Sequence, residues 1–365
     1  MKNLKVFKNS RVIITGHTGF KGSWLTAWLK QLGANIMGIS LDVPTHPSHF
    51  KVSNIGKNIK DIRLDIRDEK KLEKKIINFK PKFVFHLAAQ SLVAKSYQEP
   101  SLTWQTNVIG TLNVLQALRK LKNVCNAVII TSDKCYFNKE IRYGYKETDI
   151  LGGKDPYSGS KASAEILVKS CIDSFFLKSN KNIRIATARA GNVIGGGDWA
   201  NYRIIPDCVR SWSKYEKVKL RNPNATRPWQ HVLEPLSGYL RLGELLYSNK
   251  DLCGESFNFG PKPETNFSVE HLMIEMSKYW SEVKWKVEVL DNNVKEAGLL
   301  KLNCDKALHS LDWVPNLNFN DTVTLVANWY KTYFNNPKSN MKEFTLEQIK
   351  FYEKVAYNQN LSWIK

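Results

Sequence analysis

A glycine-rich turn near the start of the chain constrains the fold more than any other feature. Arg11–Thr15 reads RVIIT, a β-branched run that predicts a buried strand. Gly16, Gly19 and Gly22 follow at the spacing GxxGxxG, and a helical pattern of apolar residues comes next, at Trp24, Leu25, Trp28, Leu29 and Leu32. Gly33 ends this predicted helix. A strand that leads through such a turn into a helix is how α/β folds bind dinucleotides.

Each glycine of the turn has an expected task. Gly16 permits the tight turn, Gly19 lets a pyrophosphate approach the backbone, and Gly22 lets the helix pack close to the sheet. The N–H groups of the helix start, from Phe20 onward, then face the phosphates. The alternative is a plain strand–helix turn with no ligand.

Asp42 lies 20 residues after Gly22, just beyond a second predicted strand at Asn35–Ser40. There it can accept hydrogen bonds from an adenosine ribose diol, and it would repel a 2′-phosphate. The sequence therefore favours NAD over NADP, although an acidic loop residue without a ligand is the open alternative.

Two later segments are further cofactor candidates. Asp65 and Ile66 follow a short predicted strand at Ile62–Leu64, where they could contact adenine. Leu87, Ala88 and Ala89 end the strand predicted at Phe83–Leu87, and the small alanines allow close approach of a cofactor. We interpret His17, in the glycine turn, and His86, directly before Leu87, as structural histidines rather than catalysts.

The remaining pattern predicts an α/β fold, a Rossmann-like doubly wound parallel sheet with a smaller, irregular C-terminal substrate-binding lobe. A further strand is predicted at Ala127–Thr131, with helices at Lys70–Phe79, Trp104–Leu121 and Tyr157–Phe176. Beyond about residue 190, glycines and prolines interrupt the alternation. We expect an NAD-binding domain at 1–190, a nucleotide-sugar-binding lobe mainly at 191–340 with segments returning to the core, and a C-terminal helix and tail at 341–365.

Composition excludes several classes of protein. Hydrophobic residues are 42% and charged residues 24%, which fits a globular fold and not a disordered chain. The formal charge of +20 could attract nucleic acid or a nucleotide diphosphate, but the lysines form no block, so we expect a solvated lysine-rich surface and no nucleic-acid partner.

The six cysteines form no CxxC pair, which argues against a zinc site or a disulfide framework. No apolar stretch has the length of a signal peptide or a membrane span. We therefore expect a cytoplasmic protein with no bound metal and no membrane association.

Tyr157 and Lys161 stand four residues apart, after a predicted N-cap at Asp155 and a proline at the first helical position. Both side chains then lie on one helix face, one turn apart. A free tyrosine has a pKa near ~10, and a neighbouring ammonium favours the phenolate. The pair suits a base that removes a hydroxyl proton, and it lies downstream of a strand that ends in Thr131, Ser132, Asp133 and Lys134.

Together these segments resemble the extended short-chain dehydrogenases/reductases, and within that group most closely the CDP-glucose 4,6-dehydratases. The matching segments span roughly residues 10–330: GHTGFKGSWL (16–25), HLAAQ (86–90), TSDKCY (131–136), YGYKETDILGGKDPYSGSK (143–161), ARAGNVIGGGDW (188–199) and RNPNATRPWQHVLEPLSGY (221–239). Sugar-nucleotide epimerases and decarboxylases share the fold and the tyrosine–lysine pair, but not the Ser-Asp-Lys trio.

The resemblance implies a reaction in three steps. C4 of the hexose is oxidised, water is eliminated across C5–C6, and the hydride returns to C6. Tyr157 with Lys161 would act as the base at the 4-hydroxyl, and Ser132 would share that hydrogen bond. Asp133 and Lys134 are the candidates for removing the C5 proton and protonating the leaving hydroxyl. The related dTDP-glucose dehydratases carry aspartate–glutamate here, so Lys134 leaves open which residue removes the C5 proton.

The resemblance also implies a substrate site. Arg227 is expected to bind the diphosphate, a task that suits a guanidinium fork. Gln90, Asn192 and His231 are expected to complete the nucleotide-sugar site, and Trp229 is either a stacking platform or a core residue. Ser91 and Ala94 replace the proline and arginine usual in the family, which leaves the hexose less certain than the reaction.

We therefore expect an NAD-dependent nucleotide-sugar 4,6-dehydratase that converts CDP-glucose to CDP-4-keto-6-deoxyglucose. A dehydratase or epimerase for another nucleotide hexose is the nearest alternative, and a non-catalytic NAD-sensing regulator is the remote one. The predicted helices at 104–121 and 157–176 carry more apolar residues than one sheet face needs, which predicts a homodimer.

Overall fold

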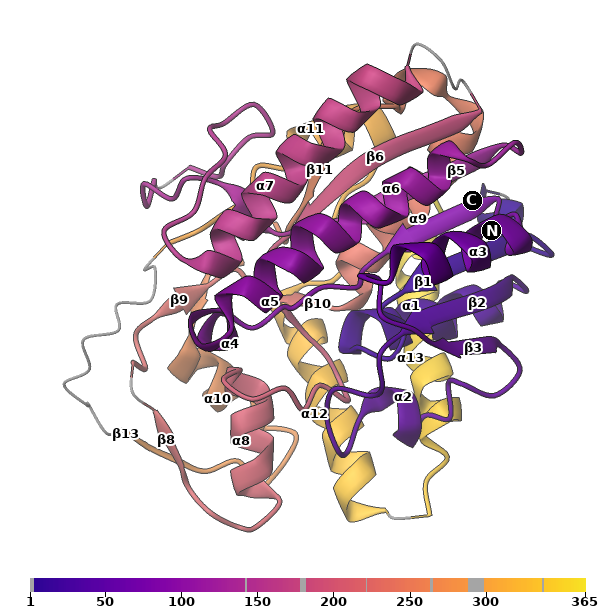
Figure 1. Ribbon diagram of the computed structural model, residues 1–365. Coiled ribbons are helices and arrows are strands. Elements are labelled where there is room, and N and C mark those ends of the chain that lie inside the picture. The colour runs from indigo at the N-terminus through magenta and orange to yellow at the C-terminus, as the bar shows by residue number, and fades with distance from the viewer. Residues whose placement is uncertain are drawn as a thin grey trace.

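A parallel sheet of seven strands organises the molecule (Figure 1). The computed structural model describes residues 3–141, 143–177, 182–220, 222–262, 265–287, 299–336 and 338–365. The strand order is β11-β6-β5-β4-β1-β2-β3, and every neighbouring pair is parallel. The strands are β1 (Arg11–Thr15), β2 (Asn35–Ser40), β3 (Lys60–Arg63), β4 (Phe83–His86), β5 (Cys125–Ile130), β6 (Ile183–Ala190) and β11 (Ser256–Phe259). The predicted Rossmann-like fold is confirmed.

The order of the strands places a ligand crevice. The chain moves outward from β1 through β2 to β3, then returns to the other side of β1 as β4. Such a reversal opens a crevice at the carboxyl ends of the strands, because neighbouring connections leave in opposite directions. The glycine turn, Leu87 and Ser132 follow the carboxyl ends of β1, β4 and β5, so they meet at this edge.

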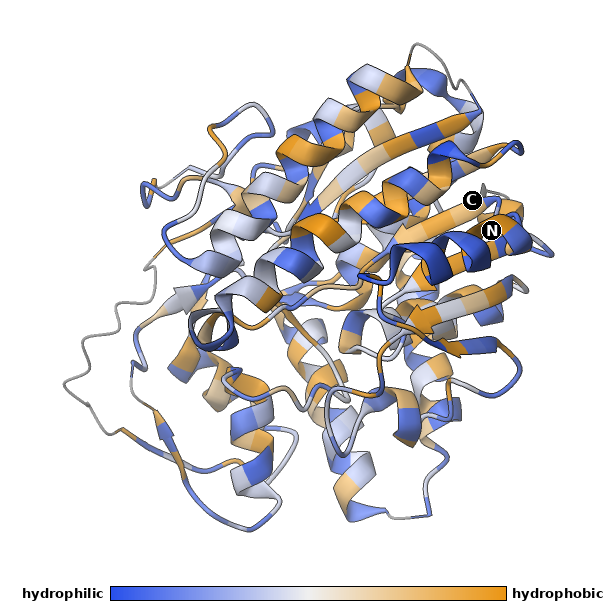
Figure 2. Ribbon diagram, in the orientation of Figure 1, coloured by the Kyte–Doolittle hydropathy of each residue, from blue (hydrophilic) through white to orange (hydrophobic). Residues whose placement is uncertain are grey.

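Helices cover both faces of the sheet (Figure 1). The helices are α1 (Phe20–Gln31), α2 (His49–Val52), α3 (Glu69–Phe79), α4 (Val93–Gln98), α5 (Pro100–Trp104), α6 (Gly110–Arg119), α7 (Pro156–Cys171), α8 (Ile204–Trp212), α9 (Leu233–Ser248), α10 (Val269–Ser277), α11 (Asp305–Leu311), α12 (Phe319–Asn335) and α13 (Met341–Asn358). Successive strand residues point to opposite faces, so Ile13 packs with α3, α6 and α7, whereas Val12 and Ile14 pack with α1 and α9. Figure 2 shows the resulting apolar strands between helices with polar outer sides.

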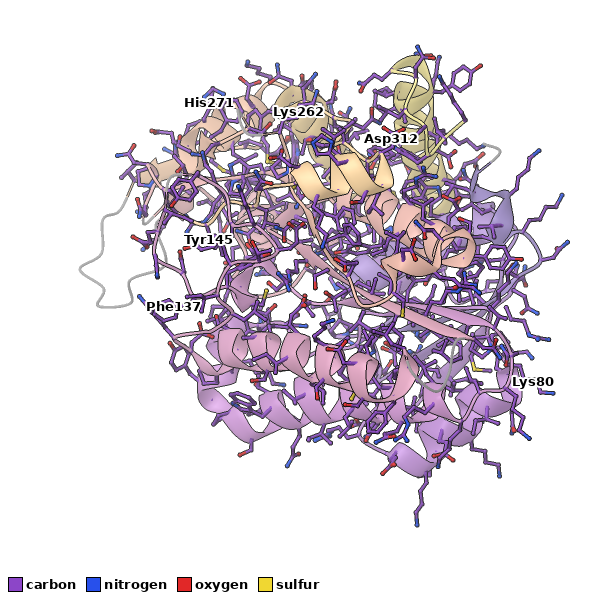
Figure 3. All side chains as sticks on the ribbon, turned by 90° about the horizontal axis from the view of Figure 1, so that it is seen from above. Lys80, Phe137, Tyr145, Lys262, His271 and Asp312 are labelled. Carbon is purple, nitrogen blue, oxygen red and sulfur yellow. The ribbon has the colours of Figure 1, made fainter. Side chains whose placement is uncertain are left out.

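The second lobe holds short elements at the carboxyl edge of the sheet. Its strands are β7 (Val193–Ile194), β8 (Val218–Leu220), β9 (Thr226–Arg227), β10 (Gln230–His231), β12 (Phe267–Ser268) and β13 (Trp285–Val287), in three two-stranded pairs. Figure 3 shows Lys262 and His271 of this lobe on the side away from α6 and α7. One hydrophobic cluster runs from the sheet into α8, α10 and α12, so the lobe shares its core with the sheet. The boundaries expected at 190 and 340 remain a prediction.

The C-terminal helix and tail are packed against the rest of the molecule. α13 contacts α1, and Trp28 Nε1 donates to Glu353 Oε1 over 2.8 Å. Trp363, in the segment expected to be a tail, is completely buried. No helix among the described residues is long and apolar enough to cross a membrane.

Some elements differ from the sequence-based prediction. The helix predicted at 104–121 begins at Pro100, and residues 105–109 form a π turn between α5 and α6. The helix predicted at 157–176 ends as α7 at Cys171 and continues through a second π turn, Ile172–Phe176. β6 and β11 were not predicted, although both are buried strands of the central sheet.

Candidate active site

The glycine turn has the geometry that a dinucleotide requires. Gly16 has φ +76°, and a Cβ there would lie 2.7 Å from the backbone nitrogen of Ala88. A Cβ on Gly22 would overlap the carbonyl oxygen of Gly16, so α1 can pack this closely only without a side chain. A Cβ on Gly19 would have only that same carbonyl, at 3.3 Å, within contact range. The backbone at Gly19, which caps α1 without a side-chain hydrogen bond, is therefore open to a phosphate.

Asp42 lies where the turn meets the end of β2. Thr18 Oγ1 and Ser40 Oγ are 2.7 Å apart, which ties the turn to this strand. The side chain of Asp42 is exposed and accepts from its neighbour Val43 N over 2.8 Å. The carboxylate is thus accessible at this strand end, and its contact with an adenosine ribose remains a prediction.

Asp65, which the sequence predicted to lie near adenine, is engaged with a neighbouring arginine. Arg67 Nε and Nη2 donate to Asp65 Oδ2 over 2.9 and 2.6 Å. These hydrogen bonds lower the pKa of Asp65 despite partial burial. Ile66 is buried against Gly110 of α6, where a Cβ would strike its side chain. A contact between Asp65 and adenine would therefore use a carboxylate that already binds arginine.

The two histidines near the glycine turn are buried and hydrogen-bonded to other side chains of the protein. His86 Nε2 lies 3.0 Å from Thr111 Oγ1, which donates its own proton to Asn107 O, so Nε2 must be the protonated nitrogen. His86 Nδ1 then accepts from Thr15 Oγ1 over 2.7 Å, and Thr15 in turn accepts from Ala88 N. Burial lowers the pKa of His86 to about 3, so this chain of neutral groups fixes the backbone at Ala88. The ring of His17 is buried and bonds Asp61.

The side chain of Gln90 is occupied by the protein itself. Its Nε2 donates to Leu92 O and Thr103 Oγ1, and its Oε1 accepts from Leu92 N. Asn107, in the first π turn, bonds both backbone groups of Gln90 and donates to Ser160 Oγ over 2.8 Å. In this structure Gln90 therefore shapes the loop beside α7, whereas the sequence indicated direct contact with substrate.

The start of α7 presents Tyr157 and Lys161 to the crevice. Asp155 caps the helix by accepting from Ser158 N over 2.9 Å, and Pro156 occupies the first turn. Both Tyr157 and Lys161 are buried, at 7% and 6% exposure. Burial raises the pKa of Tyr157 to about 12, while a hydrogen bond with Ser132 and the charge of Arg203 oppose the rise. Burial also lowers the pKa of Lys161 to about 8.

The end of β5 brings the expected trio against this pair. Ser132 caps a short 3-10 helix (η3, Asp133–Cys135) by accepting from Lys134 N, and its hydroxyl donates to Asp133 Oδ1 over 2.8 Å. Asp133 is 4% exposed, whereas Lys134 is half-buried. A phenol, a hydroxyl and a carboxylate therefore converge at one point of the crevice.

Two cations at this point were not predicted. Lys21 projects from the glycine turn, and burial with the charge of Arg203 lowers its pKa to about 8, while Asp133 opposes this. Arg203 precedes α8, forms an ion pair with Asp198 at 2.8 Å and acts on Tyr157. A charged residue inside the glycine turn was a sequence signal for Lys21, but no local pattern marks Arg203.

The expected substrate residues divide into two groups. Asn192 is exposed after β6, and Arg227 is half-buried in β9, so both can meet a ligand. His231 is completely buried, with its ring edge against Trp24 and its Nδ1 accepting from Leu233 N, so direct contact with substrate was the wrong expectation for it. Trp229 is a core residue whose Nε1 donates to Phe267 O over 2.9 Å.

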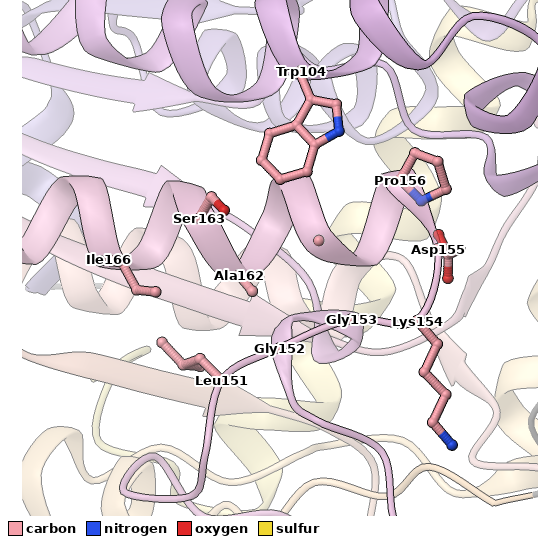
Figure 4. Close-up of a pocket in the computed structure, with 11 residues that line it drawn as sticks. Trp104, Leu151, Gly152, Gly153, Lys154, Asp155, Pro156, Ala162, Ser163 and Ile166 are labelled. Atoms are coloured by element: carbon pink, nitrogen blue, oxygen red, sulfur yellow. The ribbon is translucent and has the colours of Figure 1, made fainter.

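A separate pocket lies on the outer side of α7 (Figure 4). Trp104, Gly152, Gly159 and Ile166 are among the residues that line it, whereas Tyr157 and Lys161 are not. This surface therefore belongs to the outside of the helix layer. No group of three or more metal-binding side chains occurs within the described ranges.

Comparisons with known sequences match this architecture. The model of the family described as GDP-mannose 4,6 dehydratase matches residues 13–326. CDP-glucose 4,6-dehydratase of Salmonella typhimurium is 44% identical over 331 residues, which cover 90% of this chain and 92% of that protein.

Solved structures share the fold at low identity. The epimerase Mth375 of Methanothermobacter thermautotrophicus superposes with a TM-score of 0.77 at 22% identity, over 93% of this chain and 97% of that one. UDP-glucuronic acid 4-epimerase of Bacillus cereus, in complex with UDP-glucuronic acid and NAD, gives a TM-score of 0.74 at 21% identity, over 88% and 99% of the two chains.

Proposed function

Because the chain belongs to the family of GDP-mannose 4,6 dehydratases, we propose that it is an NAD-dependent 4,6-dehydratase whose substrate is CDP-glucose. The observation that carries this proposal is the convergence of Tyr157, Ser132 and Asp133 at the carboxyl edge of the sheet. The 44% identity to a CDP-glucose 4,6-dehydratase supports both the reaction and the nucleotide sugar.

The residues of the glycine turn fit NAD. The open backbone at Gly19 and the start of α1 would hold the pyrophosphate, and exposed Asp42 would hold the adenosine ribose. Leu87–Ala89 would line the path toward the nicotinamide. When bound, NAD would supply the hydride acceptor for C4 of the sugar and the hydride donor for C6.

The first proton transfer belongs to Tyr157. Its phenolate removes the proton of the 4-hydroxyl. The hydroxyl of Ser132 would favour the phenolate by turning its single proton from Asp133 Oδ1 to the Tyr157 oxygen. Arg203 favours the phenolate by its charge, and Lys161 lies one helical turn away on the same face. The product of this step is a ketone at C4, which makes the C5 proton acidic.

Elimination then belongs to Asp133 and Lys134. One of them removes the C5 proton and the other protonates the hydroxyl that leaves C6, so that a water molecule departs and a C5–C6 double bond forms. When the hydride returns to C6, the residue that took the C5 proton would give a proton back to C5. Asp133 accepts a hydrogen bond from Ser132, and Lys134 follows it in the chain and is half-buried. Arg227 and Asn192 would bind the diphosphate and the nucleotide sugar.

A dehydratase or epimerase that acts on another nucleotide hexose is the second candidate. Ser91 and Ala94 adjoin the loop that Gln90 and Asn107 hold, so the surroundings of the sugar differ here from the family pattern. A panel of nucleotide hexoses therefore accompanies every assay.

Two variants test which residues act in the oxidation at C4 and which act in the elimination of water. Tyr157→Phe removes the C4 base, and we expect oxidation and elimination both to fall by about 10²–10⁴-fold. Asp133→Asn combined with Lys134→Met keeps that base, so a single turnover should leave reduced cofactor on the enzyme without loss of water. Near-normal water loss in the double variant would overturn the assignment of Asp133 and Lys134.

A further inference from the structure

A buried ion pair joins α7, the helix that carries Tyr157 and Lys161, to β6. Glu165 is on α7, one turn after Lys161, and its Oε2 lies 2.9 Å from Arg189 Nη2 of β6. The side chains of the pair are 2% and 4% exposed. The proposed mechanism uses neither residue.

Glu165 ties the helix to two strand ends. It accepts from the hydroxyls of Thr131, which follows β5, and Thr187 of β6. Thr131 immediately precedes Ser132, so the carboxylate holds the segment that carries the catalytic hydroxyl. On the other side of the guanidinium, Arg189 Nη1 donates to Tyr136 Oη and to the carbonyl of Glu147.

The packing of α7 on the sheet does not account for this charge. A buried ion pair is often no more stabilising than apolar side chains of the same volume, because both ions lose their hydration. Apolar residues at 165 and 189 could hold α7 against β6 equally well. A negative charge one helical turn from a buried ammonium needs a different explanation.

We propose that Glu165 is a positioning residue that keeps the Lys161 ammonium charged and fixes the Ser132 strand end beside Tyr157. The inference rests on the proposed roles of Tyr157 and Lys161. In this role Glu165 and its partners form a second layer of charged and polar groups beneath the site. The layer is carried by α7, by β6 and by the residue that follows β5.

The electrostatics of the region agree with this role. Burial lowers the pKa of Lys161, whereas Cys135 and Glu165 raise it. Burial raises the pKa of the Cys135 thiol well above its usual range, so the thiol is uncharged near neutral pH. His86 and Lys21, the other titratable groups that act on Lys161 or respond to it, carry no negative charge. Arg189 and its hydrogen-bonding neighbours keep the pKa of Glu165 below its usual value. Glu165 is therefore the anion that retains the Lys161 proton.

The test compares pH profiles of Glu165→Gln, Glu165→Asp and the double variant Glu165→Gln/Arg189→Met. The double variant removes the unpaired arginine that could unfold the single variant. We expect the alkaline limb of turnover to move to lower pH by about one unit in both glutamine variants, because Lys161 loses its proton earlier. The aspartate variant keeps the charge and should keep the limb. A limb that stays in place in the glutamine variants, or a double variant that does not fold, would mean that the pair is only structural.

A second readout does not require turnover. NMR titration of the Lys161 ammonium, assigned as the lysine signal that is lost in Lys161→Met, should give a lower pKa in the double variant than in the wild type, because Glu165 no longer favours the charged form. Inactivity of the wild-type protein on every nucleotide hexose would contradict the proposed function, whereas this titration would still decide the role of Glu165.

Discussion

At the scale of single residues, the surroundings of Tyr157 show which site residues a local sequence pattern can predict. The spacing to Lys161 and the helix cap predicted one shared helix face, and the structure has it. Ser132 and Asp133 were also predicted, because they follow a recognisable strand. Arg203 could not be predicted, since it reaches Tyr157 from a segment 46 residues away through the fold of the second lobe. His231 was misassigned because a motif does not reveal that its ring is buried against Trp24.

Arg203 gives a prediction at this scale. Its charge lowers the pKa of Tyr157, which burial raises to about 12. Replacement by methionine should raise that pKa further, so the phenolate fraction and the turnover should fall most at low pH and recover as the pH rises. Arg203→Lys keeps the charge and serves as the control. The measurement is the acid limb of kcat, and an equal loss at every pH would show that Arg203 only binds substrate.

At the scale of elements, hydrophobic periodicity predicted the strands next to the glycine turn. It missed β6 and β11, which form one edge of the sheet. β1, β2 and β4 were found within a residue or two, because β-branched runs precede clear helical patterns. β6 reads IRIATARA, whose small and charged residues hide a strand that is buried on both faces. The packing of α13 on α1 joins the two ends of the chain, and no local pattern contains such a contact.

Glu353 makes that packing depend on pH. Burial raises its pKa to about 7, while hydrogen bonds from Trp28 and Gln31 oppose this. Because the folded pKa lies above the ordinary value of 4.5, its proton stabilises the fold at low pH, and this contribution is lost as the pH rises through 7. Glu353→Gln should therefore stabilise the protein at pH ~8, by on the order of 2 kcal/mol, and much less at pH ~5. Thermal unfolding at both values is the measurement, with exposed Glu347→Gln as the control; an equal effect of the two substitutions would refute this.

At the scale of the whole molecule, α4 to α7 leave an apolar outer surface. Tyr97, Trp104, Ile109 and Ile166 are 64%, 40%, 47% and 59% exposed, and two of them line the pocket outside α7 (Figure 4). The helices α6 and α7 run side by side there (Figure 1), so a second copy could form a four-helix interface around a two-fold axis.

We predict a homodimer built on this surface. Ile166→Asp should convert it to a monomer at micromolar concentration, because a charge would be buried at the centre of the interface. Ile274→Asp, on α10 and 44% exposed, is the matched control and should leave the dimer intact. Light scattering measures both, and a monomeric wild-type protein would contradict the prediction.

The central claim is that the hydride leaves C4 and returns to C6 of the same sugar while water is lost. CDP-glucose carrying deuterium at C4 tests this most directly, with mass spectrometry and NMR of the product. The account predicts a product lighter by one water, with the deuterium now on C6 and no net reduced cofactor released. A product of unchanged mass with C4 inverted would make the protein an epimerase, and deuterium found in released cofactor would make it a simple dehydrogenase.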